Sequence, residues 1–235
     1  HVSYVNAVRG QGGQNSIGPE RDDNLGALRT YELLKAMSVL RVDIGWLADN
    51  RNNSIVDFGL SKSAEETFEF WDKNYTIKRM IRMVRAYKPD IIIPTFLDVN
   101  GQHGHHRSVT RATIEAYDKS NDPEMFPDDN FGPWKISQIF LPAWSGGGGS
   151  YDDEEDPPKA THSIDVGNFN HIYGGTYNQI GEWSRSYHAT QNIGKLAYED
   201  KMDVPLHLLK GTYVDGDITG GCLLYTSDAA DDRRC

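Results

Sequence analysis

Apolar and polar positions alternate between strand-like and helix-like stretches along the chain. Residues 1–8, HVSYVNAV, alternate as a half-buried strand does, and the Gly-rich stretch RGQGGQNSIGPE that follows is typical of a loop. Apolar residues then recur near helical spacing over residues 24–40, and DIGWLADN, residues 43–50, favours a short strand. The first fifth of the chain therefore predicts strand, loop, helix and strand in that order.

The next stretch repeats this order with a longer helical part. Residues 64–87 carry acidic side chains early and basic ones late, as a helix dipole favours, and their length predicts one long helix or two. KPDIIIPTF, residues 88–96, is a short apolar β-branched run of the kind buried on both faces of a parallel sheet, and residues 108–119 return to helix. Repeated strand-loop-helix units predict an α/β fold whose loops gather at the carboxyl ends of parallel strands, where ligands bind.

The second half of the chain is less regular. Its pattern predicts strands at 135–144 and 162–167, a helix from about 177 to 198 and a final apolar piece at 205–211, while SGGGGSYDDEEDPPKA, residues 145–160, predicts a flexible acidic loop that is unlikely to pack. Residues 222–235 fit no preceding periodicity and resemble a translated sequencing adapter. We interpret 1–221 as one domain and 222–235 as a non-native tail.

Composition narrows the possible functions. The formal charge is −10 with a pI near 5.2, and Lys and Arg form no cluster, so a nucleic-acid-binding surface is not expected. No apolar run approaches the ~18 residues that a membrane span requires. The chain opens without Met or a leader, so we expect its N-terminus to lie within a longer protein. Both cysteines belong to the tail, so cysteine usage indicates no compartment.

Three of the eight histidines lie within four residues of the stretch NGQHGHHRSV, just after the apolar run 88–96. His103 and His106 have the H-x-x-H spacing that brings two imidazoles to one site. Asp98 precedes them, and a carboxylate there could accept the second ring N–H of a liganding histidine. The alternative is a group of solvated histidines at a helix start.

The Gly-rich loop is the second candidate site. Asn15 stands where G-x-G-x-x-G requires its third glycine, so the dinucleotide fingerprint fails. The Gln14 and Asn15 amides either reach toward a polar ligand or belong to a plain strand-to-helix connection. Arg29 is either an exposed helix charge or a residue that points back at the same site.

Several motifs in order resemble the LmbE-like or PIG-L family of zinc-dependent N-deacetylases. They are RGQGGQNSIGPE…LRTYELLKA, DFGLSKSAEETFEFW, YKPDIIIPTF and GQHGHHRSV, with YNQIGEWSRSYHATQNIG and PLHLLKG further on, and together they cover most of residues 1–211. The resemblance implies a Rossmann-like α/β sandwich that hydrolyses the N-acetyl group of an N-acetylglucosamine-type sugar. In such a fold residues 1–15 correspond to the second strand and its loop, so the first strand is expected to be missing.

The resemblance also implies residue roles. His106 matches the third zinc ligand, and His103 matches the histidine that acts as acid or oxyanion stabiliser at the scissile carbonyl. Asp98 falls near a family acidic position beside the catalytic groups. Arg29, with Gln14 and Asn15 in the loop beside it, matches substrate-binding positions, and so does His188 in the late helix.

The resemblance further implies a cofactor that this chain does not fully hold. Two zinc ligands and the catalytic carboxylate come from an H-P-D-D-E-type motif that is absent here, so those groups are expected upstream of His1 and the 235-residue chain is expected to be inactive. Its partner would be a small molecule or glycan that bears an N-acetyl group. The alternative is a carbohydrate-binding module of the same fold without catalysis. A periplasmic or secreted parent protein would suit the family, but no residue here indicates the compartment.

Overall fold

The computed structural model describes residues 1–235 except 49–53, 128–129, 145–152, 193–202 and 213–235. The helices are α1 (Asp22–Leu40), α2 (Ala64–Trp71), α3 (Lys73–Tyr87), α4 (Gly104–Lys119), α5 (Tyr177–Arg185) and a short 3₁₀ helix (Ala189–Gln191). The strands are β1 (Ser3–Asn6), β2 (Asp43–Trp46), β3 (Ile91–Ile92), β4 (Gln138–Pro142), β5 (His162–Asp165), β6 (Phe169–Asn170), β7 (Gly175–Thr176) and β8 (Asp203–Lys210).

The first four strands form two parallel pairs, as the strand-loop-helix order predicts. Ser3 of β1 lies opposite Asp43 of β2, and Ile91 of β3 lies opposite Gln138 of β4. Helices connect the members of each pair, because parallel neighbours need a crossover. The predicted α/β class, with parallel strands flanked by helices, is confirmed.

The second half departs from a purely parallel sheet. The strand order is β3-β4-β8-β5, and β8 runs antiparallel to both of its neighbours. The apolar pattern at 205–211 predicts a strand but does not encode its direction, so the mixed sheet could not be expected from it. A separate antiparallel pair, β6 and β7, leads into α5.

Residues 64–87 form two helices rather than one. Asp72 separates α2 from α3 in a backbone conformation with φ +58°, and its carboxylate accepts a hydrogen bond from the Tyr75 N–H at 3.2 Å. Ser63 caps α2 in the same way through the Glu66 N–H. A local cap at each helix start satisfies N–H groups that have no partner inside the helix.

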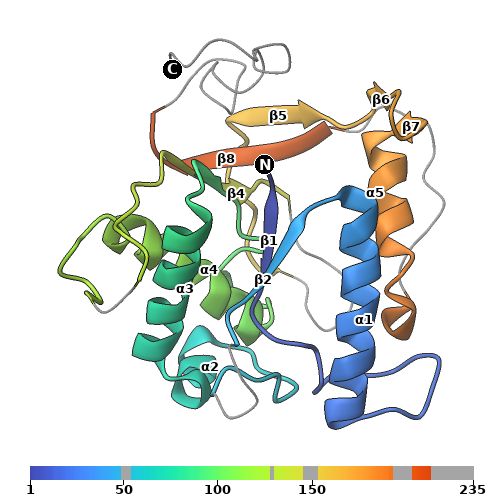
Figure 1. The fold of residues 1–235 in the computed structure, drawn as a ribbon, viewed down its shortest axis with the longest axis horizontal. Helices are drawn as coiled ribbons and strands as arrows, with labels where there is room; N and C mark the ends of the chain where they lie inside the picture. The colour runs from blue at the N-terminus through green and yellow to red at the C-terminus, as the bar shows by residue number, and fades with distance from the viewer. Residues whose placement is uncertain (49–53, 128–129, 145–152, 193–202, 213–235) are drawn as a thin grey trace.

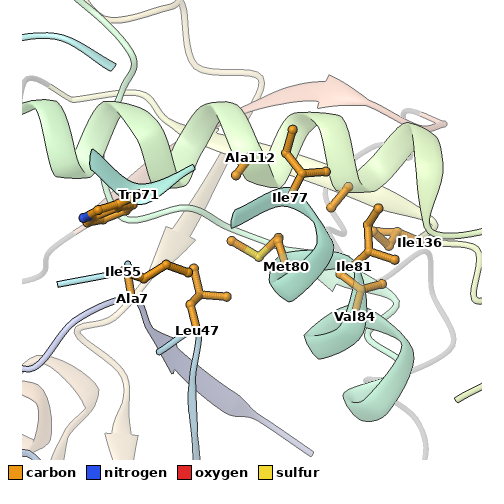
Figure 2. Close-up of a cluster of buried hydrophobic side chains, with 11 residues drawn as sticks. Ala7, Leu47, Ile55, Trp71, Ile77, Met80, Ile81, Val84, Ala112 and Ile136 are labelled. Atoms are coloured by element: carbon orange, nitrogen blue, oxygen red, sulfur yellow. The ribbon is translucent and has the colours of Figure 1, made fainter. Parts of the chain in front are cut away.

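Helices cover both sides of the β1–β2 pair (Figure 1). On one side α1 packs against Ile44 and Trp46 of β2 through Leu33, Ala36 and Met37. On the other side lies the larger core, which joins the ends of β1 and β2 to the helices α2, α3 and α4. Its buried members are Ala7, Leu47, Ile55, Trp71, Ile77, Met80, Ile81, Val84, Ala112, Ala116 and Ile136 (Figure 2).

Three expectations need correction. The run 88–96 contributes only two strand residues, because Pro94 has no N–H to continue the ladder. Ile93 is 43% exposed rather than buried. α4 begins at Gly104, four residues before 108, so the histidines lie in its cap and first turn. α5 ends at Arg185, well short of 198.

Some predictions fall outside the part of the chain that the structure describes. They are the end of the helix expected to reach 198, residues 145–152 of the acidic loop and the tail 222–235. Within the described ranges, none of the helices combines the length and the apolar character that crossing a bilayer demands.

Candidate functional site

Loops that follow β1, β2 and β3 meet at one place, as the parallel arrangement predicts. A Cβ added to Gly12, in the loop after β1, would lie 2.6 Å from the Gly59 nitrogen and 2.7 Å from the Asp57 carbonyl oxygen, in the loop after β2. The Gly59 carbonyl in turn lies 3.1 Å from Nε2 of His103, which ends the loop after β3. The Gly-rich loop and the histidines therefore line two sides of one region.

Close packing fixes the start of α4 at the histidines. His103 is the N-cap in an extended conformation, and its Nδ1 accepts a hydrogen bond from the His105 N–H at 3.2 Å. A Cβ on Gly104 would lie 2.1 Å from Ser61 Oγ and 2.4 Å from the Ser63 carbonyl oxygen. Only glycine lets the helix start approach the loop before α2 this closely.

The hydrogen bonds of His103 define its protonation. Because Nδ1 accepts, the ring proton sits on Nε2, which donates to the Gly59 carbonyl. Burial lowers the pKa of His103, and the nearby Asp57 carboxylate partly opposes that shift. An acid or oxyanion-stabilising role would use the same Nε2–H that Gly59 now accepts, and this role stays a prediction.

His106 is held with one nitrogen toward the protein. Its Nδ1 lies 2.8 Å from Gln102 Oε1, and its ring stacks on Phe96 with centroids 3.9 Å apart. Burial, with His103 and His105 as further causes, lowers the pKa of His106 to about 3, so the ring is neutral at pH 7. Its Nε2 has no hydrogen-bond partner among the described residues, which is the state required of a metal-ligating imidazole.

His105 lies in the core, although it belongs to the same cluster. It is 6% exposed, stacks on Trp71 with centroids 5.0 Å apart and meets Phe58 edge-on. Burial lowers its pKa to about 3, and its Nδ1 is 3.7 Å from Asp57 Oδ1, too far for a hydrogen bond. Its contacts indicate a packing role, which the cluster of three histidines did not reveal.

The hydrogen bond expected from a histidine to Asp98 is not the one found. Asp98 Oδ1 accepts from Arg107 Nε at 2.9 Å, and Oδ2 accepts from Arg111 Nε at 2.7 Å. Both arginines lie on α4, so Asp98 fastens the loop after β3 to that helix. Gln102 takes the position beside His106 that the sequence suggested for Asp98.

Arg29 organises the Gly-rich loop. It is half-buried rather than exposed, and its guanidinium donates to the carbonyls of Gly10 at 2.9 Å and Gln14 at 2.6 Å. Asn15 is also used internally, since its Oδ1 accepts from the Ile17 and Gly18 N–H groups. The side chain of Gln14 is exposed. Substrate contacts by these residues stay a prediction.

His188 lies near the same loop from the far end of the chain. Burial lowers its pKa, and charges on Glu32, Arg185 and Arg29 also act on it. Two residues further on, the Thr190 carbonyl accepts from the Ser16 N–H of the Gly-rich loop at 2.9 Å. The buried carboxylate of Glu32 accepts from the N–H of Thr190 at 2.8 Å and from its hydroxyl at 2.7 Å. This link attaches the segment after α5 to α1, and a substrate role for His188 stays a prediction.

Sequence reasoning missed Gln102 and Asp57. Gln102 precedes His106 by four residues, a spacing that brings side chains together across the start of a helix, so the pattern could have shown it. Asp57, whose Oδ1 accepts from the Gly59 N–H at 2.9 Å, lies within the long connection between β2 and α2, where no sequence pattern marks it.

The residues fit one zinc ligand and not a complete site. In the described ranges, no group of three or more His, Cys, Asp or Glu side chains is placed to hold a metal ion. Three or four ligands are usual for zinc in proteins. His106 supplies a suitably oriented nitrogen, and the H-P-D-D-E-type motif that would supply others is absent from this sequence.

Comparisons with known proteins place the first half of the chain. Residues 1–117 match the family model described as PIG-L: GlcNAc-PI de-N-acetylase. The 1D-myo-inositol 2-acetamido-2-deoxy-alpha-D-glucopyranoside deacetylase 1 of Catenulispora acidiphila is 24% identical over 157 residues, 61% of this chain and 47% of that protein. A deacetylase of the same description from Streptomyces scabiei is 29% identical over 132 residues, 53% of this chain and 39% of its own length.

A third relative is named for a different amide. The mycothiol S-conjugate amidase of Streptomyces coelicolor is 26% identical over 119 residues, 47% of this chain and 38% of that protein. The matched part of this chain spans less than half the length of each of these three relatives. Among solved structures, N,N'-diacetylchitobiose deacetylase from Pyrococcus horikoshii aligns with a TM-score of 0.47 and 18% identity over 87% of this chain and 73% of that one.

Proposed function

We propose that this chain, which belongs to the PIG-L family, forms part of a zinc-dependent hydrolase that removes the acetyl group from an N-acetylglucosamine-type amino sugar. Two of the relatives are named as deacetylases of a 2-acetamido-2-deoxy-glucopyranoside attached to inositol. The observation that carries the proposal is the state of His106, a neutral imidazole with Nδ1 held and Nε2 without a partner among the described residues.

An amide resists hydrolysis because its carbonyl is weakly electrophilic and its nitrogen is a poor leaving group. A bound zinc ion would polarise that carbonyl and lower the pKa of a bound water toward about 7. His106 would hold the metal through Nε2. Among the described residues, no group of three or more His, Cys, Asp or Glu side chains is placed to complete the ligand set.

His103 is the proposed acid or oxyanion stabiliser. Its ring lies beside that of His106, with centroids 5.4 Å apart, and its Nε2 carries the proton. Movement of that N–H from the Gly59 carbonyl to the scissile carbonyl oxygen would stabilise charge that develops there. A group of this kind contributes about 10² to 10⁴ in rate.

Arg29, Gln14, Asn15 and His188 are the proposed substrate side of the site. Arg29 holds the Gly-rich loop through the carbonyls of Gly10 and Gln14, and that loop meets the Asp57–Gly59 turn below His103. A sugar bound between the loop and the histidines would place polar hydroxyls against these groups. Asp98 is proposed to act indirectly, because its bonds to Arg107 and Arg111 anchor the helix whose start carries both histidines.

The experiment compares two proteins. The 235-residue chain alone is expected to bind zinc weakly and to release no acetate, because it presents one oriented ligand. The product of the full reading frame is expected to retain zinc by elemental analysis and to release free amine from an N-acetylglucosaminyl inositol, with activity lost in chelator and restored by zinc.

The decisive variant of the full reading frame is His106→Ala. It is expected to lose both zinc and turnover, whereas His171→Ala, which removes an exposed histidine outside the site, leaves both unchanged. If His106→Ala retained full zinc and full turnover, the proposed role of His106 would be wrong. A full-length protein that binds the sugar without hydrolysing it would favour the carbohydrate-binding alternative.

A further inference from the structure

We propose that Gln102, anchored by Asp153 of the acidic segment, is the positioning residue that fixes which nitrogen of His106 is available to a metal. That a metal binds to His106 rests on the proposed function, whereas the positioning of the ring does not. Gln102 is 1% exposed and lies four residues before His106, at the cap of α4. Its amide makes contacts on both sides.

Two partners determine the orientation of the Gln102 amide. Oε1 accepts a hydrogen bond from the His103 backbone N–H at 2.9 Å, and Nε2 donates to Asp153 Oδ1 at 2.9 Å. In the flipped amide, NH₂ would face an N–H donor and the carbonyl oxygen would face a carboxylate. Both contacts would become repulsive, so the chemistry of the partners selects one orientation.

The fixed amide determines the tautomer of His106. Oε1 lies 2.8 Å from His106 Nδ1 and can only accept, so the ring proton must sit on Nδ1. Nε2 then keeps its lone pair.

The acidic segment is docked where it meets Gln102, which corrects the expectation that it would not pack. The Glu154 N–H donates to the Asn100 carbonyl at 2.8 Å, and Glu155 Oε1 accepts from the Asn100 N–H at 3.3 Å. Together with the contact from Gln102 to Asp153, these bonds join three consecutive residues of the acidic segment to Asn100 and Gln102. Residues 153–155 therefore clamp the loop that leads into the histidines.

The test is a direct measurement of the His106 tautomer. Long-range ¹H–¹⁵N correlation spectra of the uniformly ¹⁵N-labelled 235-residue chain, at pH 7 without zinc, distinguish the Nδ1–H form from the Nε2–H form. We expect the wild-type ring to be Nδ1–H. Gln102→Leu, which keeps the side-chain size and removes the acceptor, is expected to lower the ratio of Nδ1–H to Nε2–H about five- to tenfold, the effect of one hydrogen bond.

Two further variants separate positioning from folding. Gln102→Glu keeps an oxygen acceptor and is expected to retain the Nδ1–H form, while Asp153→Ala, which frees one end of the amide, gives a smaller shift than Gln102→Leu. Glu154→Gln is the matched control, because Glu154 bonds to Asn100 through its backbone N–H, and it is expected to behave as wild type.

A wild-type Nε2–H ring would overturn the inference, and so would a Gln102→Leu ring that remains Nδ1–H. If Gln102→Leu does not fold, the wild-type spectrum and Asp153→Ala still decide, since an Asp153→Ala ring identical to wild type removes the role of the acidic segment. These spectra involve neither zinc nor substrate. Failure of the positioning and failure of the proposed activity would therefore be seen in different measurements.

Discussion

The two sides of the candidate site use their polar groups differently. In the histidine loop, residues 100–106, the Gln102 amide holds Nδ1 of His106 and leaves Nε2 of that ring without a partner among the described residues. In the glycine loop, residues 9–20, Arg29 and Asn15 bond to backbone groups of the loop itself. The histidine loop leaves one ring nitrogen available to a ligand, whereas the hydrogen bonds of the glycine loop hold the conformation of its backbone.

This difference indicates how each side would take part in binding. A ligand at the histidine loop would meet a fixed atom whose protonation is already chosen, whereas a ligand at the glycine loop would meet a surface shaped by hydrogen bonds made beneath it. Substitutions of His103 or His106 should therefore change chemistry more than stability. Substitutions in the glycine loop should change the order of that loop first.

The largest expected effect is on the histidine side. In the full reading frame, His103→Asn is expected to lower kcat about 10²- to 10⁴-fold, because an amide cannot replace an imidazole as acid. The asparagine oxygen can still cap α4, so the free energy of unfolding should change little. Turnover and urea unfolding measured together would separate the two, and a His103→Asn protein with wild-type kcat would remove His103 from the chemistry.

The next largest effect is on the packing beneath the histidines. Gly104→Ala is expected to cost about 1–3 kcal/mol of unfolding free energy, because its methyl group would lie 2.1 Å from Ser61 Oγ and 2.4 Å from the Ser63 carbonyl. Gly181→Ala in α5 is the matched control, with no atom within 4 Å of the new methyl.

In Gly181→Ala the helix propensity of alanine is expected to stabilise the protein by about 0.5–1 kcal/mol. Thermal or urea unfolding of both variants checks the contrast. Equal effects at the two glycines would contradict the close approach at Gly104.

Much of this site was predictable from sequence, and the missing parts share a physical cause. The Gly-rich loop, the histidine loop and their convergence follow from strand-loop-helix order, which local apolar patterns encode. The partner of Asp98 does not follow, because the choice between a histidine and the arginines Arg107 and Arg111 depends on side-chain directions across α4. The local spacing of apolar residues does not predict such contacts between segments.

The same limit applies at longer range. The clamp on Gln102 comes from Asp153, about fifty residues later, in a segment whose Gly and acidic composition favours a loop that does not pack. The antiparallel direction of β8 is likewise set by its neighbours β4 and β5. Sequence patterns identified the elements well, while the pairings of elements distant in sequence required the structure.

The third effect depends on pH and concerns His105 and His106 of the histidine side. His105 and His106 have pKa values of about 3 in the folded chain, below the ordinary value of 6.5. Above pH 6.5 the two histidines are neutral in both the folded and the unfolded chain, so they do not lower the free energy of unfolding. As pH falls from 6.5 toward 3, only the unfolded chain takes up these protons, so stability is lost at about 1.4 kcal/mol per pH unit for each histidine.

Urea unfolding at pH 7, 6 and 5 checks this slope. His105→Phe keeps a ring against Trp71 and removes one titrating group, so its slope should be shallower by about one proton, whereas His171→Phe on the surface should leave the slope as in wild type. An unchanged slope in His105→Phe would contradict the burial of a neutral imidazole there.

The smallest effect belongs to the glycine side and tests whether that loop is held from beneath. Arg29→Met removes the donors to Gly10 and Gln14 while it keeps most of the side-chain length, and it is expected to cost about 1–2 kcal/mol. Because the lost bonds are local, amide hydrogen exchange should accelerate over residues 10–18 more than in α1. Lys35→Met, which removes an exposed cation on the same helix that contacts only the Tyr31 ring in the described structure, should accelerate exchange in neither region.

If Arg29→Met left exchange in the loop unchanged but weakened sugar binding by the full reading frame, Arg29 would contact the ligand directly. The two sides of the site would then differ less than their hydrogen bonds indicate.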